Sequence, residues 1–508
     1  MYEAVSASTP NRRAGSPLTF KPLTVILASL LATAVIATVG SLSEVSLGDE
    51  NYHVRQARAY AEQGRRVPYG PLFSSVDDRA PLPFNAAPLW HGGLAVLWRL
   101  IGSPSQIVAQ IYQAGFYLLL LLSVYFGVRQ IWNDSAASWA WLLIATMPMV
   151  CVYSILLYQD IPGIAVSALA LLLLWRKNFL WAGVCLAAAY LVKMNMLSYA
   201  PWAVVFAAWW ARGTWKRRLT AAALVAAPVV LSFAGDYLWR LKTYGSMTGV
   251  GVGNLSDLPA GAMAAIQANP NSVVIWNPDS IFDLRALVRH TGVPVLLAMC
   301  AAVVWAWDSI SKWVWVCAAL ALAGFIYFMA IPGYPQVRYV MPIFLVLILL
   351  CGRGIAHWRP PRAITAIIIV VCLAQAVTAC AYTYHQRQIS KWDRAAYTWM
   401  RENTPKNMRI VCPELVLTNQ TARQVIWARI NPAFFMTEAT DEQRQQLLTW
   451  FRVSYIAIPL RRIYDREKEG DHGGGYARDF VEKAQSLPYL KKVYENPGFI
   501  IFEFNCQE

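Results

Sequence analysis

Charged side chains are scarce in this chain. Of its 508 residues only 14% are Asp, Glu, Lys or Arg, whereas 57% are hydrophobic. Soluble domains contain about 25% charged and roughly 45–50% apolar residues, so this composition argues against a soluble protein. A membrane span needs about 20 mostly apolar residues, and the sequence offers eleven candidate stretches before residue 385. The chain is therefore predicted to be a polytopic α-helical membrane protein.

Motifs that would indicate several other functions are missing. The chain has no CxxC pair, no His/Cys cluster with zinc spacing and no Walker A loop. Seven of the nine cysteines lie in or beside apolar stretches, where Cys behaves as a small hydrophobic residue. Only Cys412 and Cys506 lie in polar sequence, where they either stay reduced or, outside the cytosol, form one disulfide. No metal site is predicted.

The apolar stretches define the predicted spans. The stretch 86–101 is also apolar, but it is short and contains Pro88, His91, Gly92 and Gly93, so it is predicted to lie at the interface without crossing. The eleven predicted spans are 22–43, 107–131, 137–156, 161–175, 179–193, 197–211, 219–239, 291–307, 313–331, 338–352 and 363–384.

The distribution of basic residues predicts the sidedness. Net charge is +15, from 44 Lys and Arg against 29 Asp and Glu, and cytoplasmic loops explain this excess better than nucleic-acid binding does. If the N-terminus is cytoplasmic, the outer breaks near 157–160 and 332–337 contain no Lys or Arg, whereas the breaks on the other side contain many. The positive-inside rule therefore predicts a cytoplasmic N-terminus and an outer C-terminus.

This topology divides the chain into three parts. A cytoplasmic tail is predicted at 1–21, and a membrane region at 22–384 with outer loops 44–106 and 240–290. The outer segment 385–508 is long enough for a small domain. Its helix-like and strand-like runs predict an α/β fold.

Acidic residues mark the predicted outer surface. Asp49 and Glu50 open the first outer loop, at the start of a predicted helix over 50–63 that ends at Gly64, a normal C-terminal cap. Asp160 lies in a very short outer break between two spans, where a carboxylate is costly and therefore a functional candidate. Two such acids suit a general base and a group that orients a hydroxyl. Either could instead be an ordinary helix cap.

Basic residues occur at the same level as these acids. Arg and Lys are natural binders of a phosphate leaving group, although a cation at a helix end can also simply reach the lipid headgroups. His53 in the first outer loop and Tyr339 are further site candidates. The four candidate cations are Lys193, Arg240, Lys242 and Arg338.

The order of these features carries a resemblance. One span is followed by an outer loop that opens with an acidic pair, then by a Pro-apolar-Trp segment beside the membrane, and then by a second acid followed by Pro. The residues concerned are Asp49-Glu50, Ala87-Pro88-Leu89-Trp90 through Ile101-Gly102, Asp160-Ile161-Pro162, Lys193 and Arg338-Tyr339. This order resembles the GT-C superfamily of membrane glycosyltransferases, in shape mainly the protein O-mannosyltransferases and aminoarabinose transferases. The segment 49–62 is also similar to the dolichyl-phosphoglucose glucosyltransferases.

The resemblance implies a reaction and roles for individual residues. A sugar linked to polyprenyl or dolichyl phosphate would pass, with inversion, to a hydroxyl of a lipid, glycan or protein. Asp49 would take the proton of the acceptor, and Glu50 and Asp160 would orient the acceptor or support the base. Lys193 and Arg338 would neutralise the leaving phosphate. No cofactor beyond this lipid-linked co-substrate is required, and a divalent metal is left open.

Two other functions fit a polytopic membrane protein. A lipid-glycan transporter or flippase would carry cations along a path through several spans, whereas here they lie at span ends. A polymerase or ligase that uses a lipid-linked glycan would need large outer loops but no acid pair after the first span. The polar chain end, Asn505-Cys506-Gln507-Glu508, contains no retention signal and favours a bacterial inner membrane over the endoplasmic reticulum.

Overall fold

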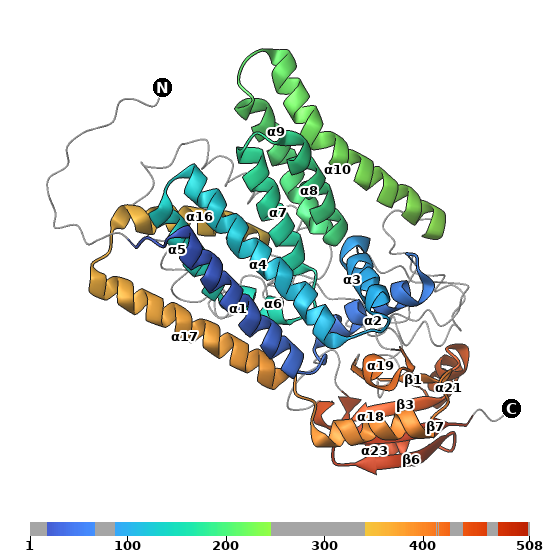
Figure 1. The fold of residues 1–508 in the computed structure, drawn as a ribbon. Coiled ribbons are helices and arrows are strands. Elements are labelled where there is room, and N and C mark those ends of the chain that lie inside the picture. The colour runs from blue at the N-terminus through green and yellow to red at the C-terminus, as the bar shows by residue number, and fades with distance from the viewer. Residues whose placement is uncertain are drawn as a thin grey trace.

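The computed structural model of the chain describes residues 18–66, 87–244, 341–412, 414, 416–426, 440–464 and 476–505. A helix bundle occupies the larger part, and a sheet with its covering helices lies at one end of it (Figure 1). The predicted spans 291–307 and 313–331, the candidates Arg338 and Tyr339, and Cys506 lie outside the described residues.

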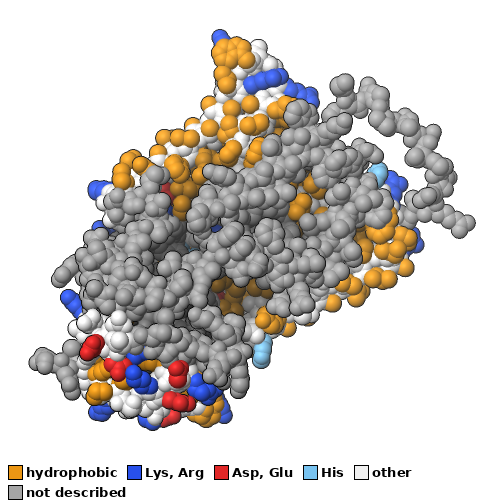
Figure 2. All heavy atoms as spheres, turned by 180° about the vertical axis from the view of Figure 1, so that it is seen from behind, with side chains coloured by type: hydrophobic (Ala, Val, Ile, Leu, Met, Phe, Trp, Pro, Cys, Tyr) orange, Lys and Arg blue, Asp and Glu red, His pale blue; other side chains and the backbone are white. Residues whose placement is uncertain are grey.

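Among the residues that the structure describes, four helices are long and apolar enough to cross a membrane, or five spans if a bent helix pair is counted as one. In three of them at most 22% of the most apolar window is buried, so most of its side chains face outward; in the fourth, Gln106–Ile131, half of the window is buried. Where the helical surface is coloured in Figure 2, hydrophobic side chains cover most of it; Lys and Arg stand at its edges, and most of the acidic side chains gather at the C-terminal part. An apolar surface of this kind matches lipid rather than water, so the chain is a membrane protein. The four helices are α1 (Pro22–Leu42), α4 (Gln106–Ile131), α10 (Trp215–Tyr244) and α17 (Arg362–Gln386).

Shorter helices make up the rest of the bundle. The predicted span 137–156 is two helices, bent by 55° where Met147 precedes Pro148. Proline disfavours helical geometry in the residue before it, which explains the break. The helices concerned are α5 (Asp134–Thr146), α6 (Pro148–Ile155), α7 (Asp160–Trp175), α8 (Phe179–Val192), the 3₁₀ turn η1 (Met194–Ser198), α9 (Tyr199–Trp210) and α16 (Met341–Trp358).

Small residues bring these helices close together. Gly183 of α8 lies against the backbone of α10, where an added Cβ would be 2.6 Å from the carbonyl oxygen of Val225. Gly352 of α16 lies equally close to Ala136 of α5. Close approach at small residues is the usual way in which helices pack inside a membrane.

Two helices lie across the end of the bundle at which α1 and α10 finish and α4 and α7 begin (Figure 1). The first, α2 (Gly48–Gln63), ends at Gly64 as the sequence predicts, because this glycine adopts a left-handed φ of 69°. The second, α3 (Pro88–Ile101), covers the predicted interfacial stretch. Its Trp90, Leu94 and Trp98 are buried. We refer to this end of the bundle as the α2 end.

The last part of the chain folds around a five-stranded sheet of order β2-β1-β3-β7-β6. Strand β1 runs parallel to β2 and β3, and β7 runs antiparallel to β3 and β6. A second sheet pairs β4 with β5. The strands are β1 (Arg409–Val411), β2 (Gln424–Ile426), β3 (Tyr455–Pro459), β4 (Ile463–Tyr464), β5 (Tyr476–Ala477), β6 (Leu490–Asn496) and β7 (Phe499–Phe504).

Helices accompany these strands. Helix α18 begins at Ser390, whose hydroxyl accepts a hydrogen bond from the backbone N–H of Asp393, and its Ala396, Tyr397 and Met400 are buried in the core shared with the sheet. Cys412 is also buried in this core. The remaining elements are α18 (Lys391–Asn403), α19 (Val416–Thr421), α21 (Asp441–Trp450), the 3₁₀ turn η5 (Leu460–Arg462) and α23 (Arg478–Ala484).

Candidate active site

The first turn of α2 holds Asp49 and Glu50. The Glu50 carboxylate accepts hydrogen bonds from the backbone N–H groups of Ser46 and Leu47 at 2.9 and 2.8 Å, which fixes the start of the helix. Asp49 is half-buried, and its backbone N–H donates to the hydroxyl of Tyr158 at 3.0 Å. Negative charge in the first turn is favourable because it faces the positive end of the helix dipole. The chain therefore holds Asp49 in a defined place beside the segment that leads into α7.

Glu50 forms a fully buried ion pair with Arg387. Their side chains are 0% exposed, and the Nε and Nη2 atoms of Arg387 lie 3.2 Å from the two carboxylate oxygens. Arg387 also donates to the Gly40 carbonyl at 3.1 Å and the Ser43 hydroxyl at 2.7 Å. The pair thus joins the end of α17 to the connection between α1 and α2. Arg387 lies 337 positions from Glu50, and no local sequence pattern indicates the contact.

Asp160 and Lys193 form a second ion pair. Asp160 is the first residue of α7 and Lys193 directly follows α8, so the two antiparallel helices bring them together. Their side chains are 4% and 13% exposed. A predicted acid and a predicted phosphate-binding cation therefore contact one another, at the same end of the bundle as α2.

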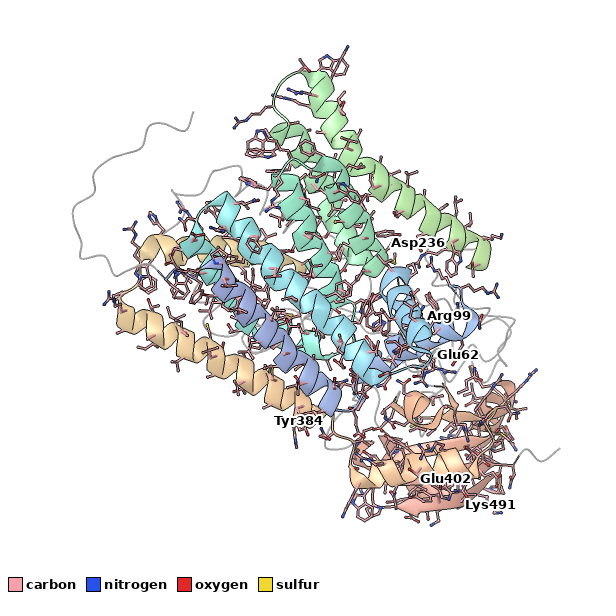
Figure 3. All side chains as sticks on the ribbon, in the orientation of Figure 1. Glu62, Arg99, Asp236, Tyr384, Glu402 and Lys491 are labelled. Carbon is pink, nitrogen blue, oxygen red and sulfur yellow. The ribbon has the colours of Figure 1, made fainter. Side chains whose placement is uncertain are left out.

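A third group of charges surrounds Asp236, which is not among the predicted site residues. Its carboxylate lies 2.8 Å from Nε of Arg240 and 2.7 Å from Nη1 of Arg66, and it accepts a hydrogen bond from the Tyr190 hydroxyl at 3.0 Å. The guanidinium of Arg66 also stacks over Trp239, 3.5 Å from the ring centre. Asp236 lies on the half of α10 that approaches α3 (Figure 3). We call Arg66, Tyr190, Asp236 and Arg240 the Asp236 cluster.

The Asp236 cluster is built from three separate segments of the chain. Two guanidinium groups share one carboxylate, while Tyr190 is neutral. Arg66 follows α2, Tyr190 belongs to α8, and the other two residues belong to α10. The signal in the sequence is an aspartate four residues before an arginine near the end of an apolar helix, a spacing that places both on one face.

Two buried histidines join α2 to α3. The Nδ1 atom of His53 lies 3.0 Å from Nε2 of His91, and Nδ1 of His91 lies 3.1 Å from the Ala87 carbonyl. Only an N–H can bind that carbonyl, so His91 donates through Nδ1 and accepts from His53 through Nε2. Burial lowers the pKa of His91 to about 3, and nearby Arg66 contributes in the same direction. His91 is therefore neutral at physiological pH.

The segment before α7 connects the histidines to the acids. Gln159 donates to the Ala87 carbonyl at 3.0 Å, and the ring of Tyr158 lies against that of His53 with centroids 5.8 Å apart. Tyr158 also accepts the N–H of Asp49, as described above. One short connection thus contacts both α2 and α3.

The structure brings most of the predicted site residues to the α2 end. Asp49, Glu50, His53, Asp160 and Lys193 all lie there, and Arg240 lies in the Asp236 cluster. Lys242 is exposed on the last turn of α10. Among the described residues, no group of three or more His, Cys, Asp or Glu side chains could hold a metal ion.

The comparisons with known proteins agree on one architecture. Residues 87–235 match the family model described as dolichyl-phosphate-mannose-protein mannosyltransferase. ArnT from Cupriavidus metallidurans in the apo state has a TM-score of 0.64 at 11% identity, with 95% of this chain and 97% of that chain covered. The same protein bound to undecaprenyl phosphate gives 0.59 at 12%, covering 95% and 98%. The chain has the GT-C fold.

A second GT-C protein with the same fold is the archaeal oligosaccharyltransferase AglB from Archaeoglobus fulgidus, in complex with an inhibitory peptide and a dolichol-phosphate. Its TM-score is 0.59 at 14% identity, with 85% of this chain and 69% of that chain covered. No protein with a curated description is significantly similar in sequence. The predicted GT-C fold is confirmed.

Proposed function

We propose that the protein transfers a sugar from a polyprenyl- or dolichyl-phosphate donor to a hydroxyl acceptor at the α2 end of the bundle. The observation that carries this proposal is the unequal surroundings of the three acids. Glu50 and Asp160 are buried, whereas Asp49, in the first turn of α2, is only partly buried. Asp49 is the acid that a substrate can approach.

Asp49 acts as the general base in this scheme. As the acceptor oxygen attacks the anomeric carbon, its proton passes to the Asp49 carboxylate. The bond between that carbon and the phosphate oxygen breaks, and the lipid phosphate leaves with the bonding electrons. Attack opposite the leaving group inverts the anomeric centre. Holding the hydroxyl next to the carbon contributes through proximity and orientation.

The Asp236 cluster supplies positive charge for the leaving phosphate. Its two guanidinium groups lie in a largely buried place, where a charge interacts more strongly than it would in water. Lys193 is neutralised in part by Asp160, so its role is to hold α7 and α8 together until a phosphate competes for it. Lys242 and Arg338 are proposed as further phosphate-binding residues from their positions in the sequence alone. Arg338 and Tyr339 lie outside the described residues. His53 positions the site through His91.

The remaining parts of the proposal concern topology. The α2 end faces away from the cytoplasm, with the N-terminus in the cytoplasm and an outer domain over 385–508. The exposed apolar surface of the bundle supports a membrane location, and a bacterial inner membrane is proposed ahead of the endoplasmic reticulum. The donor sugar is to be identified with the donor panel described below, and the acceptor is a lipid, a glycan or a protein.

The test follows release of polyprenyl phosphate from a panel of lipid-phosphate sugars by purified protein. Asp49→Asn should bind the donor but lose at least about a hundredfold in turnover, which is the scale of general-base catalysis. The matched control is Glu62→Gln, an acid-to-amide change at an exposed position of the same helix, which should leave turnover unchanged. Equal turnover by Asp49→Asn and wild type would refute the role of Asp49. Binding of a lipid-linked glycan without turnover of any donor would favour a transporter.

A further inference from the structure

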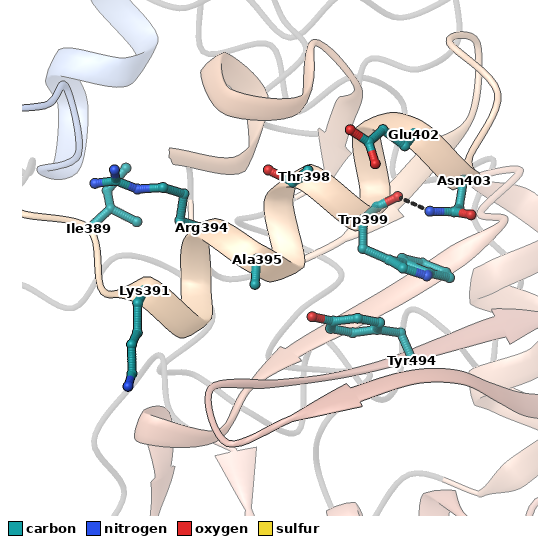
Figure 4. A pocket seen from close by; sticks show the side chains of 9 residues that line it. All are labelled: Ile389, Lys391, Arg394, Ala395, Thr398, Trp399, Glu402, Asn403 and Tyr494. Atoms are coloured by element: carbon teal, nitrogen blue, oxygen red, sulfur yellow. Dashed lines mark hydrogen bonds between the residues drawn. The ribbon is translucent and has the colours of Figure 1, made fainter.

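A basin on the C-terminal part of the chain has no role in the reaction as described so far. It has a volume of about 700 Å³ and lies along α18, with Tyr494 of β6 opposite (Figure 4). This volume falls in the range of roughly 300–1,000 Å³ that is typical of ligand sites. We call it the α18 basin.

One end of the α18 basin is an aromatic wall. The rings of Trp399 and Tyr494 lie 5.0 Å apart between centroids, at 30° to one another. The Asn403 amide donates to the Trp399 carbonyl at 2.9 Å. Aromatic rings with a polar end offer both an apolar surface and a hydrogen-bonding group to the same ligand. Such a wall fits a ligand that has C–H faces and hydroxyl edges.

The hydroxyl of Tyr494 is oriented by its neighbour. Asn496 donates through Nδ2 to the Tyr494 oxygen at 2.9 Å and to the Trp392 carbonyl at 2.8 Å. The Asn496 carbonyl oxygen accepts the N–H groups of Gly498 and Phe499 at 2.7 and 2.8 Å, which settles the orientation of the amide. Since Tyr494 accepts from Asn496, its own O–H hydrogen is left to donate. In Figure 4 this hydroxyl points along α18, toward Ala395.

The charges around the α18 basin balance. Lys391 and Arg394 are positive and Glu402 is negative, and Arg394 forms an ion pair with Glu44 at 2.9 Å. Two cations and two carboxylates leave no net charge to attract an anion such as a lipid headgroup or a nucleic acid. Together with the aromatic wall, this balance favours a neutral ligand that is rich in hydroxyl groups.

Glu44 also joins the α18 basin to the candidate active site. Besides its pair with Arg394, it accepts the backbone N–H of Ile389 at 2.8 Å. It lies in the connection between α1 and α2, five positions before Asp49. The segment that leads into α2 and the proposed base therefore contacts two lining residues of the basin, Ile389 and Arg394.

We propose that the α18 basin binds the glycan part of a neutral, saccharide-bearing acceptor. Trp399 and Tyr494 receive a sugar ring, and the Tyr494 hydroxyl and the polar side chains of α18 bind its hydroxyls. This proposal rests on the proposed function for the role of the ligand as acceptor, but the binding of the sugar does not require catalysis.

The test measures binding of three neutral trisaccharides (mannotriose, maltotriose and cellotriose) to the full chain in detergent, by saturation-transfer NMR and calorimetry without donor. We expect at least one to bind with a Kd on the order of millimolar. Ala395→Trp places a ring in the basin from an exposed position and should abolish binding. Tyr494→Phe should weaken it about three- to tenfold, the usual value of one hydrogen bond. The matched control is Trp392→Phe on the same helix but outside the lining, which should change nothing.

The outcomes separate this proposal from the proposed function. No binding of any trisaccharide, or binding that survives Ala395→Trp, would overturn the basin proposal while leaving donor turnover as it is. Association with phosphatidylglycerol vesicles that Ala395→Trp removes, without sugar binding, would assign the basin to a lipid headgroup and also overturn the proposal. Asp49→Asn should still bind the sugar. If a sugar binds but no donor is turned over, the sugar-binding site is confirmed and its role in binding an acceptor is refuted.

Discussion

The buried pair of Glu50 and Arg387 gives the sharpest prediction about how the site is held in place. Both side chains are fully buried, and each guanidinium–carboxylate contact is 3.2 Å long. Removing one partner leaves the other charge buried without its counter-ion, which typically costs about 3–5 kcal/mol. We therefore expect Glu50→Gln and Arg387→Gln each to lower the free energy of unfolding by about that amount.

The double variant should be much less damaged than the sum of the two single changes. Two amides carry no charge that needs compensation, and the glutamine that replaces Arg387 can still donate to the Gly40 carbonyl or the Ser43 hydroxyl. We expect a coupling energy of about 2–3 kcal/mol from the double-mutant cycle. The measurement is equilibrium unfolding in mixed micelles, followed by the fluorescence of the 22 tryptophans.

Donor turnover by the same variants separates a positioning role from a catalytic one. If Glu50 positions α2, turnover by the double variant should recover together with its stability. Recovery of stability without recovery of turnover would show that the Glu50 carboxylate takes part in the reaction. Strictly additive losses in stability would refute the reasoning about the ion pair itself.

Three further predictions concern other parts of the molecule. The pKa of His91 falls from 6.5 to about 3 on folding, so below pH 6.5 the unfolded chain binds a proton that the folded chain does not. The free energy of unfolding should therefore fall by about 2 kcal/mol between pH 8 and pH 5. His91→Gln should flatten this pH dependence in thermal unfolding scans. Asp236→Asn removes the carboxylate that two guanidinium groups share, so it should lower the melting temperature, and the gain of positive charge should lower the KM for the donor severalfold. A KM equal to that of wild type would argue against a phosphate near the Asp236 cluster. Gly183→Ala should destabilise the bundle by at least about 1 kcal/mol because its Cβ meets the backbone of α10, while Gly235→Ala, which has open space around it, should be tolerated in the same unfolding measurement.

Local chemistry explains why parts of the fold were predictable. Acidic residues in the first turn of a helix are favourable because they face the positive end of its dipole, and a glycine with positive φ commonly ends a helix. Both features of α2 are visible in the sequence, as Asp49, Glu50 and Gly64. Helix α3 begins at Pro88 and ends before Gly102, again at residues that mark helix ends. The break at Pro148 was in principle readable, but the continuous apolar run around it led to the prediction of a single span. Hydrophobicity alone does not distinguish a straight helix from a bent one.

Contacts between distant segments decided what the sequence did not. The chain by itself determined that it enters a membrane, that acids and cations gather at span ends, and that Asp49 and Asp160 are candidates, because composition and periodicity act locally. Only the tertiary structure paired Glu50 with Arg387, Asp160 with Lys193, and Asp236 with Arg66, since each pairing depends on how separate helices pack. The fold also buried Glu50 and Asp160 and left Asp49 as the most exposed acid of the three. A buried charge must find a partner wherever the fold brings one within reach, and one sequence does not reveal that partner.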